Sequence, residues 1–217
     1  MAELKLVIGN KNYSSWSMRP WLALRASAIP FGETLIPLYT GAADKQRILD
    51  VSSAGKVPIL IDGDVTVWDS LAIIEYLAEK FPDKKLWPAD RAARAHARAV
   101  SAEMHSGFAA LRNECGMNLH RPVGAVALSQ EARDNIARVQ EIWSDCLRRY
   151  GGPFLFGGFG GADAMYAPVV HRFRTYAIEV TADVRAYMEQ MQVLPAFQQW
   201  TRDGLAETLV IEKFETV

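Results

Sequence analysis

The fold of the first part of this chain is decided by residues 57–70, which read Val57-Pro58-Ile59-Leu60-Ile61-Asp62-Gly63-Asp64-Val65-Thr66-Val67-Trp68-Asp69-Ser70. Two β-rich runs flank a central Asp-Gly pair, and this pattern is the turn signal of a β-hairpin. A helix capped by Ser70 is expected next, because apolar residues recur at helical spacing until Pro82 ends the pattern. The stretch therefore predicts a strand, a second strand and a helix in direct succession.

The residues upstream of this stretch alternate between strand and helix signals. Residues 4–8 form an apolar run that ends at a Gly-Asn pair, which is typical of a strand closed by a turn. Residues 18–28 are rich in helix formers, with Ser17 as the expected N-cap. Residues 34–38 and 44–50 predict a second strand and a short helix. The order is βαβαββα, which implies a mixed sheet with helices on both faces.

Downstream, the pattern becomes helical. Residues 82–90 carry two prolines and four charges and are expected to be a linker. Apolar residues step by three and four through 97–111 and 136–150, and six glycines mark a loop at 151–161. Further helices are predicted at 162–176, 183–190 and 195–204. We therefore expect an α/β domain at residues 1–81, the linker at 82–90 and an all-helical domain at 91–217.

Composition excludes several functional classes. The 217 residues carry a formal charge of −1, which does not suggest a nucleic-acid-binding protein. No apolar run reaches the roughly 18 residues of a membrane span, and the first residues do not resemble a signal peptide. These features favour the cytoplasm. Cys115, Cys146 and four scattered histidines form neither a disulfide framework nor a metal-ligand spacing, so no metal site is expected.

A serine-rich motif, Tyr13-Ser14-Ser15-Trp16-Ser17, precedes the first predicted helix. Hydroxyl groups at a helix N-terminus lie among free N–H groups in a positive field, where an anion such as a thiolate is stabilised. The alternative is purely structural, with Ser17 as the cap and the other residues in a polar loop.

Two further motifs suggest recognition of a peptide-like ligand. In Lys56-Val57-Pro58, a cis bond before the proline would turn the backbone of Val57 outward to pair with an extended ligand, whereas a trans bond would not. Asp69 and Ser70 at a helix start match the ammonium and carboxylate of an amino-acid head group, although for the dipeptide alone simple capping is the favoured interpretation.

Together, in this order and spacing, the three motifs resemble the glutathione transferase superfamily, including its bacterial-type members, over nearly the whole chain. The resemblance implies a thioredoxin-like glutathione-binding domain, with a cis bond before Pro58, followed by a helical-bundle domain. Residues 159–163 fall where the family has an N-capping box. Here Gly160 replaces the usual Ser or Thr, a cap weaker by a few tenths of a kcal/mol, and Asp163 supplies the acidic third residue.

Within the superfamily, Ser14-Ser15-Trp16-Ser17 with Arg19 is similar to the Ser-Ser-Cys motif of the zeta class, which includes maleylacetoacetate isomerases. This similarity implies Ser14 and Ser15 as the catalytic residues that stabilise the thiolate. Trp16 stands where the zeta class has cysteine, which argues against isomerase activity and against omega-like mixed-disulfide chemistry. Tyr13 is a rival to the serines, because other classes use a tyrosine.

The resemblance implies glutathione as co-substrate. Asp69 is expected to hold the γ-glutamyl ammonium, and Ser70 with its helix N-terminus the γ-glutamyl carboxylate. The other residues expected to bind glutathione are Val57 and Pro58 at the cysteinyl backbone, and Lys56, Gln46 or Lys45 at the glycyl carboxylate.

The expected pocket for the electrophile is formed by Tyr13, Trp16, His105, Arg112 and Arg174. His105 and Arg112 are seven residues apart and project similarly from one predicted helix, so Arg112 could bind an acidic substrate. The alternative is an interdomain salt bridge or hydrogen bond. Arg174 is the approximate match to a zeta-class arginine that binds the substrate carboxylate.

The sequence thus predicts a glutathione transferase of the serine type that conjugates small electrophiles in detoxification, expected as a homodimer without a nucleic-acid or membrane partner. Two alternatives stay open at this point. One is a glutathione-dependent cis-trans isomerase, and the other is a non-catalytic protein that binds glutathione.

Overall fold

The computed structural model describes residues 3–215 and begins with a four-stranded sheet of order β2-β1-β3-β4. Strand β1 (Lys5–Ile8) pairs parallel to β2 (Gly32–Leu35) and antiparallel to β3 (Ile59–Asp62), which forms a hairpin with β4 (Val65–Trp68). The predicted βαβαββα order and mixed sheet are confirmed. Strand β2 begins and ends earlier than the predicted 34–38.

Helices cover both faces of this sheet. Alternate residues of β1 point to opposite faces, so Leu6 and Ile8 join the side covered by α1 (Ser15–Ala26) and α3 (Ser70–Lys80). Val7 lies on the other side, where Ile48 of α2 (Ala42–Val51) covers it. Helix α1 begins at Ser15, earlier than the expected residue 18, and Pro20 lies inside it.

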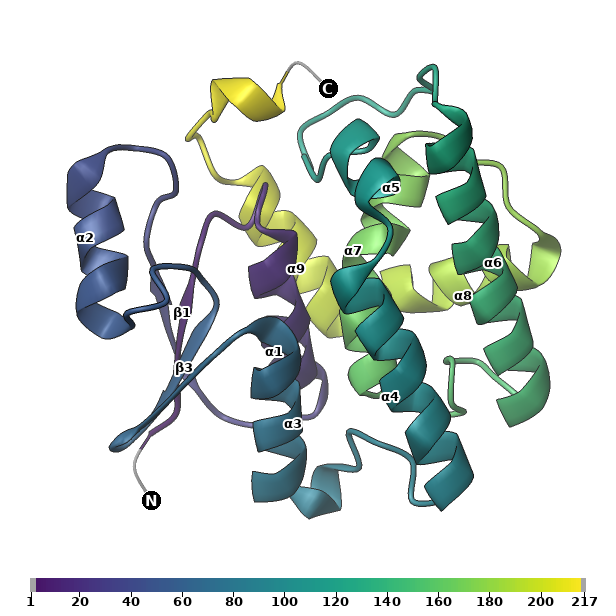
Figure 1. Ribbon diagram of the computed structural model, residues 1–217, viewed down its shortest axis with the longest axis horizontal. Coiled ribbons are helices and arrows are strands. Elements are labelled where there is room, and N and C mark those ends of the chain that lie inside the picture. The colour runs from purple at the N-terminus through teal and green to yellow at the C-terminus, as the bar shows by residue number, and fades with distance from the viewer. Residues whose placement is uncertain (1–2, 216–217) are drawn as a thin grey trace.

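The second part of the chain is helical, as predicted (Figure 1). After a 3-10 turn (Pro82–Lys84), its elements are α4 (Arg91–Ser106), α5 (Ala109–Glu114), α6 (Gln130–Tyr150), α7 (Gly161–Thr175), α8 (Ala182–Val193), α9 (Pro195–Leu205) and a final 3-10 turn (Glu212–Phe214). Among residues 3–215, no helix has the length and apolarity needed to cross a membrane.

One sequence-based expectation fails in this part. The apolar spacing through residues 97–111 predicts a continuous helix, but α4 ends at Ser106 and α5 begins after Phe108. Phe108 takes a left-handed conformation with φ of 58°. A Cβ atom on Gly107 would come within 2.8 Å of the Glu103 carbonyl oxygen, so glycine permits the tight exit from α4. His105 and Arg112 therefore lie on different helices.

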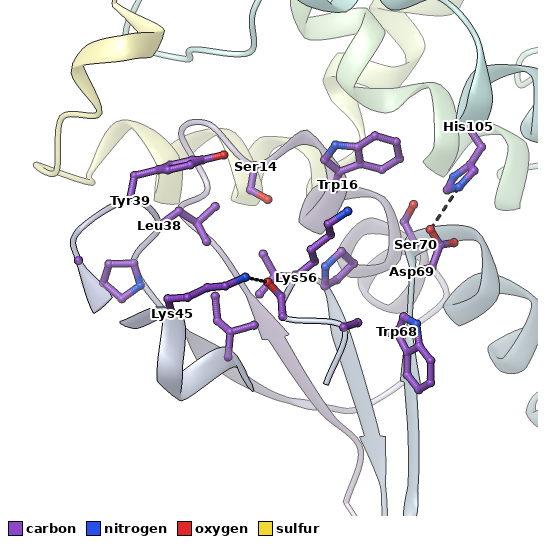
Figure 2. A pocket seen from close by; sticks show the side chains of 17 residues that line it. Ser14, Trp16, Leu38, Tyr39, Lys45, Lys56, Trp68, Asp69, Ser70 and His105 are labelled. Carbon is purple, nitrogen blue, oxygen red and sulfur yellow. Dashed lines mark hydrogen bonds and ion pairs between the residues drawn. The ribbon is translucent and has the colours of Figure 1, made fainter. Parts of the chain in front are cut away.

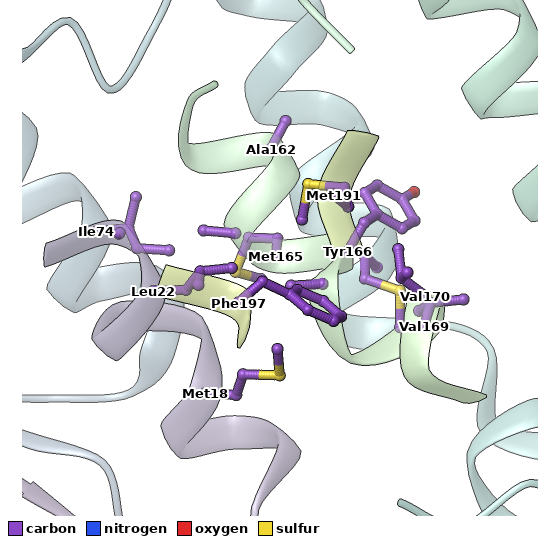
Figure 3. Close-up of a cluster of buried hydrophobic side chains, with 14 of the residues drawn as sticks. Met18, Leu22, Ile74, Ala162, Met165, Tyr166, Val169, Val170, Met191 and Phe197 are labelled. Carbon is purple, nitrogen blue, oxygen red and sulfur yellow. The ribbon is translucent and has the colours of Figure 1, made fainter. Parts of the chain in front are cut away.

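The two parts share one hydrophobic core, because α1 packs against α3 on one side and against α7 and α9 on the other. Figure 3 shows Met18 and Leu22 of α1 beside Met165 of α7 and Phe197 of α9. The expected linker contributes to this core. Its residues Leu86 and Trp87 are buried, so the 82–90 segment is packed rather than loose.

Both cysteines are packed thiols. Cys115 and Cys146 are fully buried and unpaired. Burial raises the pKa of Cys115 to about 11 and that of Cys146 to about 12, which keeps both thiols protonated at neutral pH. A protonated, inaccessible thiol is a poor nucleophile, so neither cysteine suits redox or covalent chemistry.

The start of α7 shows why Gly160 stands in the capping box. Asp163 accepts hydrogen bonds from the N–H groups of Gly160 at 2.9 Å and Leu155 at 3.0 Å. Burial raises the pKa of this carboxyl to about 7. The N–H of Gly161 donates to the Leu86 carbonyl at 2.7 Å, which brings that oxygen to 2.9 Å from where a Cβ on Gly160 would lie. The close approach of the linker thus requires glycine at position 160. Its presence there is not explained by capping strength alone.

We expect Gly160→Ser to lower the free energy of unfolding by about 1–3 kcal/mol, because the added Cβ must displace a backbone carbonyl. Urea denaturation followed by circular dichroism measures this change. Gly158→Ser is the matched control, since no atom lies within 4 Å of its added Cβ. A Gly160→Ser protein as stable as the wild type, or more stable, would contradict this expectation. It would show that the stronger serine cap outweighs the steric contact with the Leu86 carbonyl.

Candidate functional site

A cavity of about 1130 Å³ opens between the loops of the first part of the chain and α4. Figure 2 shows its side chains around one hollow, with Lys45 of α2 and His105 of α4 on opposite sides. The expected site residues that line it are Ser14, Trp16, Lys45, Lys56, Val57, Pro58, Asp69, Ser70 and His105. The expected residues outside its lining are Tyr13, Ser15, Gln46, Arg112 and Arg174.

Ser14, and not the expected Ser17, is the N-cap of α1. Its Oγ accepts the Ser17 N–H at 3.3 Å and lies 2.8 Å from the Ser17 Oγ. The Ser14 hydroxyl donates to the Ser17 Oγ, which also accepts the Gly9 N–H at 3.1 Å. Rotation of the two hydroxyls reverses this bond, so that Ser17 donates to Ser14. Ser14 can then donate its own proton into the cavity, at the positive end of a twelve-residue helix. This arrangement suits stabilisation of an anion.

Ser15 points elsewhere. Its Oγ accepts a hydrogen bond from Arg172 of α7 at 3.4 Å, and the residue is buried. Neighbouring residues of a helix lie about 100° apart around its axis, so two adjacent serines do not face the same cavity. The motif alone does not reveal which serine faces the ligand, because each of its three serines is a suitable cap.

Tyr13 is turned toward the C-terminal segment. Its hydroxyl donates to Glu215 at 2.5 Å and accepts the Ile211 N–H at 3.3 Å, and its ring lies 5.6 Å from that of Phe214. Burial and then the hydrogen bond to Glu215 raise the pKa of Tyr13. A tyrosine that stabilises a thiolate needs a free hydroxyl of low pKa, so the geometry disfavours Tyr13 in that role.

The loop before Ser14 is held by distant segments of the chain. Glu207 accepts the N–H groups of Lys11 and Asn12 at 2.7 and 3.0 Å. The Asn12 side-chain oxygen accepts the Leu119 N–H at 2.6 Å. The Lys11 ammonium lies 2.7 Å from Asp203 and 2.8 Å from Glu33. The helical part of the chain therefore fixes the position of residues 11 and 12, which directly precede the serine motif.

At the start of α3, Asp69 is the N-cap in place of the expected Ser70. Its Oδ1 accepts the N–H groups of Leu71 and Ala72 at 2.9 and 3.2 Å, and its Oδ2 lies 3.2 Å from His105 Nε2. The Asp69 carboxylate still lines the cavity and is partly exposed. Ser70 is the first helical residue, and it also lines the cavity. Both partners of the expected pair thus meet one ligand space.

The Val57-Pro58 peptide bond is cis, as predicted, and both residues line the cavity just before β3 begins. On α2, Lys45 lines the cavity and donates to the Gly55 carbonyl at 2.6 Å. Gln46 is exposed and donates to Asp50 at 2.7 Å. Of the two candidates left open on α2, only Lys45 is therefore placed at the cavity.

Trp16 forms one wall of the cavity and is 37% exposed. The guanidinium carbon atoms of Arg19 and Arg112 lie 4.3 and 5.5 Å from its ring centroid, and the His105 ring lies 5.4 Å away. Arg112 donates to the carbonyls of Met104 and His105 at 3.0 and 3.4 Å, which covers the end of α4. Arg112 thus lies behind the pocket wall, and no carboxylate among residues 3–215 forms an ion pair with it.

The arginine expected from α7 is not at the cavity. Arg174 is exposed and faces away, because helix α7 turns its buried face, with His171 and Arg172, toward the interior. The sequence analysis also missed other residues that line the cavity, namely Pro37, Leu38, Tyr39, Gly41, Ile48, Ala54, Gly55 and Trp68. A signal existed for Trp68, since a large apolar residue directly precedes Asp69 at the end of the hairpin.

Two family comparisons bear on this site. Residues 13–80 match the family described as glutathione S-transferase, N-terminal domain, and residues 92–203 match glutathione S-transferase, C-terminal domain. The chain belongs to the glutathione S-transferase family. Its thioredoxin-like first domain and all-helical second domain follow this assignment, which confirms the resemblance at the level of the superfamily.

Two curated relatives match most of this chain. The probable maleylacetoacetate isomerase of Caenorhabditis elegans is 29% identical over 201 residues, which cover 91% of this chain and 93% of the relative. Glutathione S-transferase 1 of Dianthus caryophyllus is 29% identical over 168 residues, which cover 76% of each. A crystal structure of a Burkholderia glutathione transferase homologue with bound glutathione superimposes with a TM-score of 0.72 at 24% identity, covering 94% of this chain and 100% of that one.

Tyr13→Phe tests the exclusion of Tyr13 from the site. We expect the pKa of the glutathione thiol in the bound state, followed by thiolate absorbance, to be unchanged. The free energy of unfolding should fall by about 1–2 kcal/mol, because the Glu215 carboxylate loses a hydrogen-bond donor. A raised thiol pKa in this variant would return Tyr13 to the list of thiolate-stabilising residues.

Proposed function

We propose that this protein is a glutathione transferase in which the Ser14 hydroxyl stabilises the glutathione thiolate for attack on small electrophiles. The observation that carries the proposal is the position of Ser14. It caps α1, lines the cavity and is hydrogen-bonded to the buried Ser17 hydroxyl. Ser15 accepts a hydrogen bond from Arg172 instead, so the role falls to Ser14 alone.

Glutathione would lie extended along the cavity. Its ammonium meets the Asp69 carboxylate, and its γ-glutamyl carboxylate meets the Ser70 hydroxyl at the N-terminus of α3. The backbone beside the cis Val57-Pro58 bond pairs with the cysteinyl residue, as an added strand would. Lys45 and Lys56 supply positive charge for the glycyl carboxylate. Each charge of the tripeptide thus meets an opposite charge or a helix end.

The chemical step follows from this placement. The thiol proton passes to solvent, and the Ser14 hydroxyl donates to the sulfur anion that results. The thiolate then forms a carbon–sulfur bond with the electrophile as the leaving group departs with its electron pair. Trp16 and His105 form the wall where the electrophile would lie. Arg112 stands behind this wall, and its charge favours an electrophile that carries a carboxylate.

Glutathione-dependent cis-trans isomerisation is the second candidate function. It is favoured by the similarity to the probable maleylacetoacetate isomerase of Caenorhabditis elegans. In that reaction the thiolate adds to a double bond and is later eliminated, so the product contains no sulfur. Mass spectrometry of the product therefore separates the two functions. Trp16, which stands where the zeta class has cysteine, favours conjugation.

Family membership also supports two broader parts of the proposal. The homodimer expected for this superfamily would place the first domain of one subunit against the helices of the other. A cytoplasmic role in detoxification agrees with reduced, buried cysteines.

Ser14→Ala should lower kcat/KM for conjugation about 100-fold or more and raise the pKa of the bound thiol, because the thiolate loses its hydrogen-bond donor. Ser15→Ala, a matched change one residue away, should alter kcat/KM less than about threefold. Stopped-flow thiolate absorbance across pH measures both effects. If neither serine changes the rate or the thiol pKa, the serine mechanism is wrong. A wild-type protein that binds glutathione with an ordinary thiol pKa and turns over no electrophile would be a non-catalytic binding protein.

Asp69→Ala should weaken glutathione binding about 30-fold, equivalent to about 2 kcal/mol, because the ligand ammonium loses its carboxylate partner. The substitution also removes the cap of α3. Asp90→Ala is therefore the control, since Asp90 caps α4 through the Ala93 N–H at 2.8 Å and does not line the cavity. Calorimetric titration should show weakened binding for Asp69→Ala and wild-type binding for Asp90→Ala. Equal affinities would remove Asp69 from the site.

A further inference from the structure

The hydroxyl of Ser17 is a buried group with a hydrogen-bond partner on each side. Ser17 lies in the first turn of α1 and is 0% exposed. Its Oγ accepts the N–H of Gly9 at 3.1 Å and lies 2.8 Å from the Ser14 Oγ. Gly9 directly follows β1, which lies between β2 and β3 in the sheet. This chain of hydrogen bonds is therefore anchored at the end of an interior strand, and it leads to Ser14.

The direction of the bond between the two hydroxyls decides which hydrogen bonds Ser14 can make in the cavity. Either hydroxyl can donate in such a pair, and each oxygen has two acceptor positions. One position of the Ser14 oxygen is used by the backbone N–H of Ser17 at 3.3 Å. When the Ser17 hydroxyl donates to the second position, both positions are filled. Ser14, whose oxygen is directed toward the hollow in Figure 2, can then only donate to a ligand.

A Ser14 hydroxyl that can only donate distinguishes the two forms of a thiol. A thiolate is a strong acceptor, whereas a neutral thiol is a weak acceptor and carries a proton of its own to donate. An oxygen with both acceptor positions filled cannot receive that proton, but it donates its own proton to a sulfur anion. The Gly9 N–H and the Ser17 hydroxyl polarise this last bond, because hydrogen bonds in a chain strengthen one another. The chain therefore favours the anion over the neutral thiol.

We propose that Ser17 is a positioning residue that commits the Ser14 hydroxyl to donate to a sulfur anion in the cavity. This inference rests on the proposed function, since it concerns how the Ser14 site distinguishes thiolate from thiol. In the free protein Ser14 donates to Ser17, and when a thiolate enters, both hydroxyls rotate and the bond between them reverses. Each hydroxyl keeps its own proton, so no proton moves along the chain. Ser17 does not line the cavity and acts through Ser14.

The first measurement is the pKa of the bound glutathione thiol in Ser17→Ala, followed by thiolate absorbance across pH. Without the Ser17 hydroxyl, the Ser14 oxygen regains an acceptor position and the chain from Gly9 is cut. We expect the thiol pKa to rise by about half a pH unit, which makes the thiolate-to-thiol ratio about threefold smaller at a given pH. The plateau of kcat at high pH should stay within about twofold of the wild type, because the thiolate is fully formed there. A lowered plateau with an unchanged thiol pKa would indicate a purely structural role.

A double-mutant cycle with Ser14 separates the two roles further. In Ser14→Ala the chain no longer reaches the cavity, so adding Ser17→Ala should change the thiol pKa by less than about 0.2 pH unit. Ser101→Ala is the matched control, since Ser101 of α4 is also 0% exposed and lies outside the cavity lining. It should leave the thiol pKa unchanged. Equal shifts from Ser17→Ala with and without Ser14, or no shift in either case, overturn the role of Ser17.

A pair of ligands tests the same point by calorimetric titration. Glutathione and S-methylglutathione share every group except the sulfur anion. At a pH between the thiol pKa values of bound and free glutathione, Ser17→Ala should bind glutathione about threefold more weakly than the wild type does. S-methylglutathione should bind both proteins within about 1.5-fold of the same affinity. Equal weakening of both ligands contradicts the proposal, because it shows a general loosening of the site.

Ser17→Ala also leaves the buried Gly9 N–H without its acceptor. If this variant does not fold, Ser17→Cys carries the same comparisons, because a thiol keeps a weak donor and a weak acceptor at that place. It should raise the pKa of the bound thiol in the same direction by a smaller amount, and an unchanged pKa overturns the proposal. Failure of the Ser17 variants alone leaves the proposed function in place. A Ser14→Ala protein with the wild-type thiol pKa overturns the serine mechanism itself, and the Ser17 inference with it.

Discussion

The structure depends on the packing of α1 between the sheet and the helical domain. One side of this helix meets the sheet and α3, and the other meets α7 and α9, where the Trp21 and Trp200 rings lie 5.2 Å apart. Nine of its twelve residues are buried, so the helix has almost no solvent face. Because Ser14 caps this helix, the same packing that joins the domains also fixes the position of Ser14 at the cavity.

The helical domain also holds residues 11 and 12, which precede Ser14. Glu207 and Asn12 connect residues 11–12 to segments that lie more than 100 residues further along the chain. A loop tethered to distant backbone groups keeps a hydroxyl in place at little entropic cost when the ligand arrives. Ser14 belongs to the first domain by sequence, yet its position is set by the second. The extensive packing of the thioredoxin-like domain against the helical domain therefore also places Ser14.

Local signals in the sequence predicted the elements of the first domain and its hairpin, because the turn at Asp62-Gly63 and the spacing of apolar residues act over a few residues. They did not separate Ser14 from Ser17 as the cap of α1, since either serine is chemically suited. The expectation that His105 and Arg112 share a helix was wrong, because the break at Gly107 depends on a backbone contact that spacing does not encode. Arg19 belongs to the serine motif, but arginine is normally exposed, so the sequence does not indicate its burial beside Ser70.

The contact between Leu86 and Gly160 has a consequence for how this protein can change over evolution or by engineering. The two residues come from the segment between the domains and from the start of α7, and a carbonyl of one occupies the space of a side chain on the other. A helical domain with serine or threonine at this cap cannot be joined to this linker unchanged. The segment and the capping glycine therefore form one inherited unit, and a chimaera of two family members must take both from the same parent.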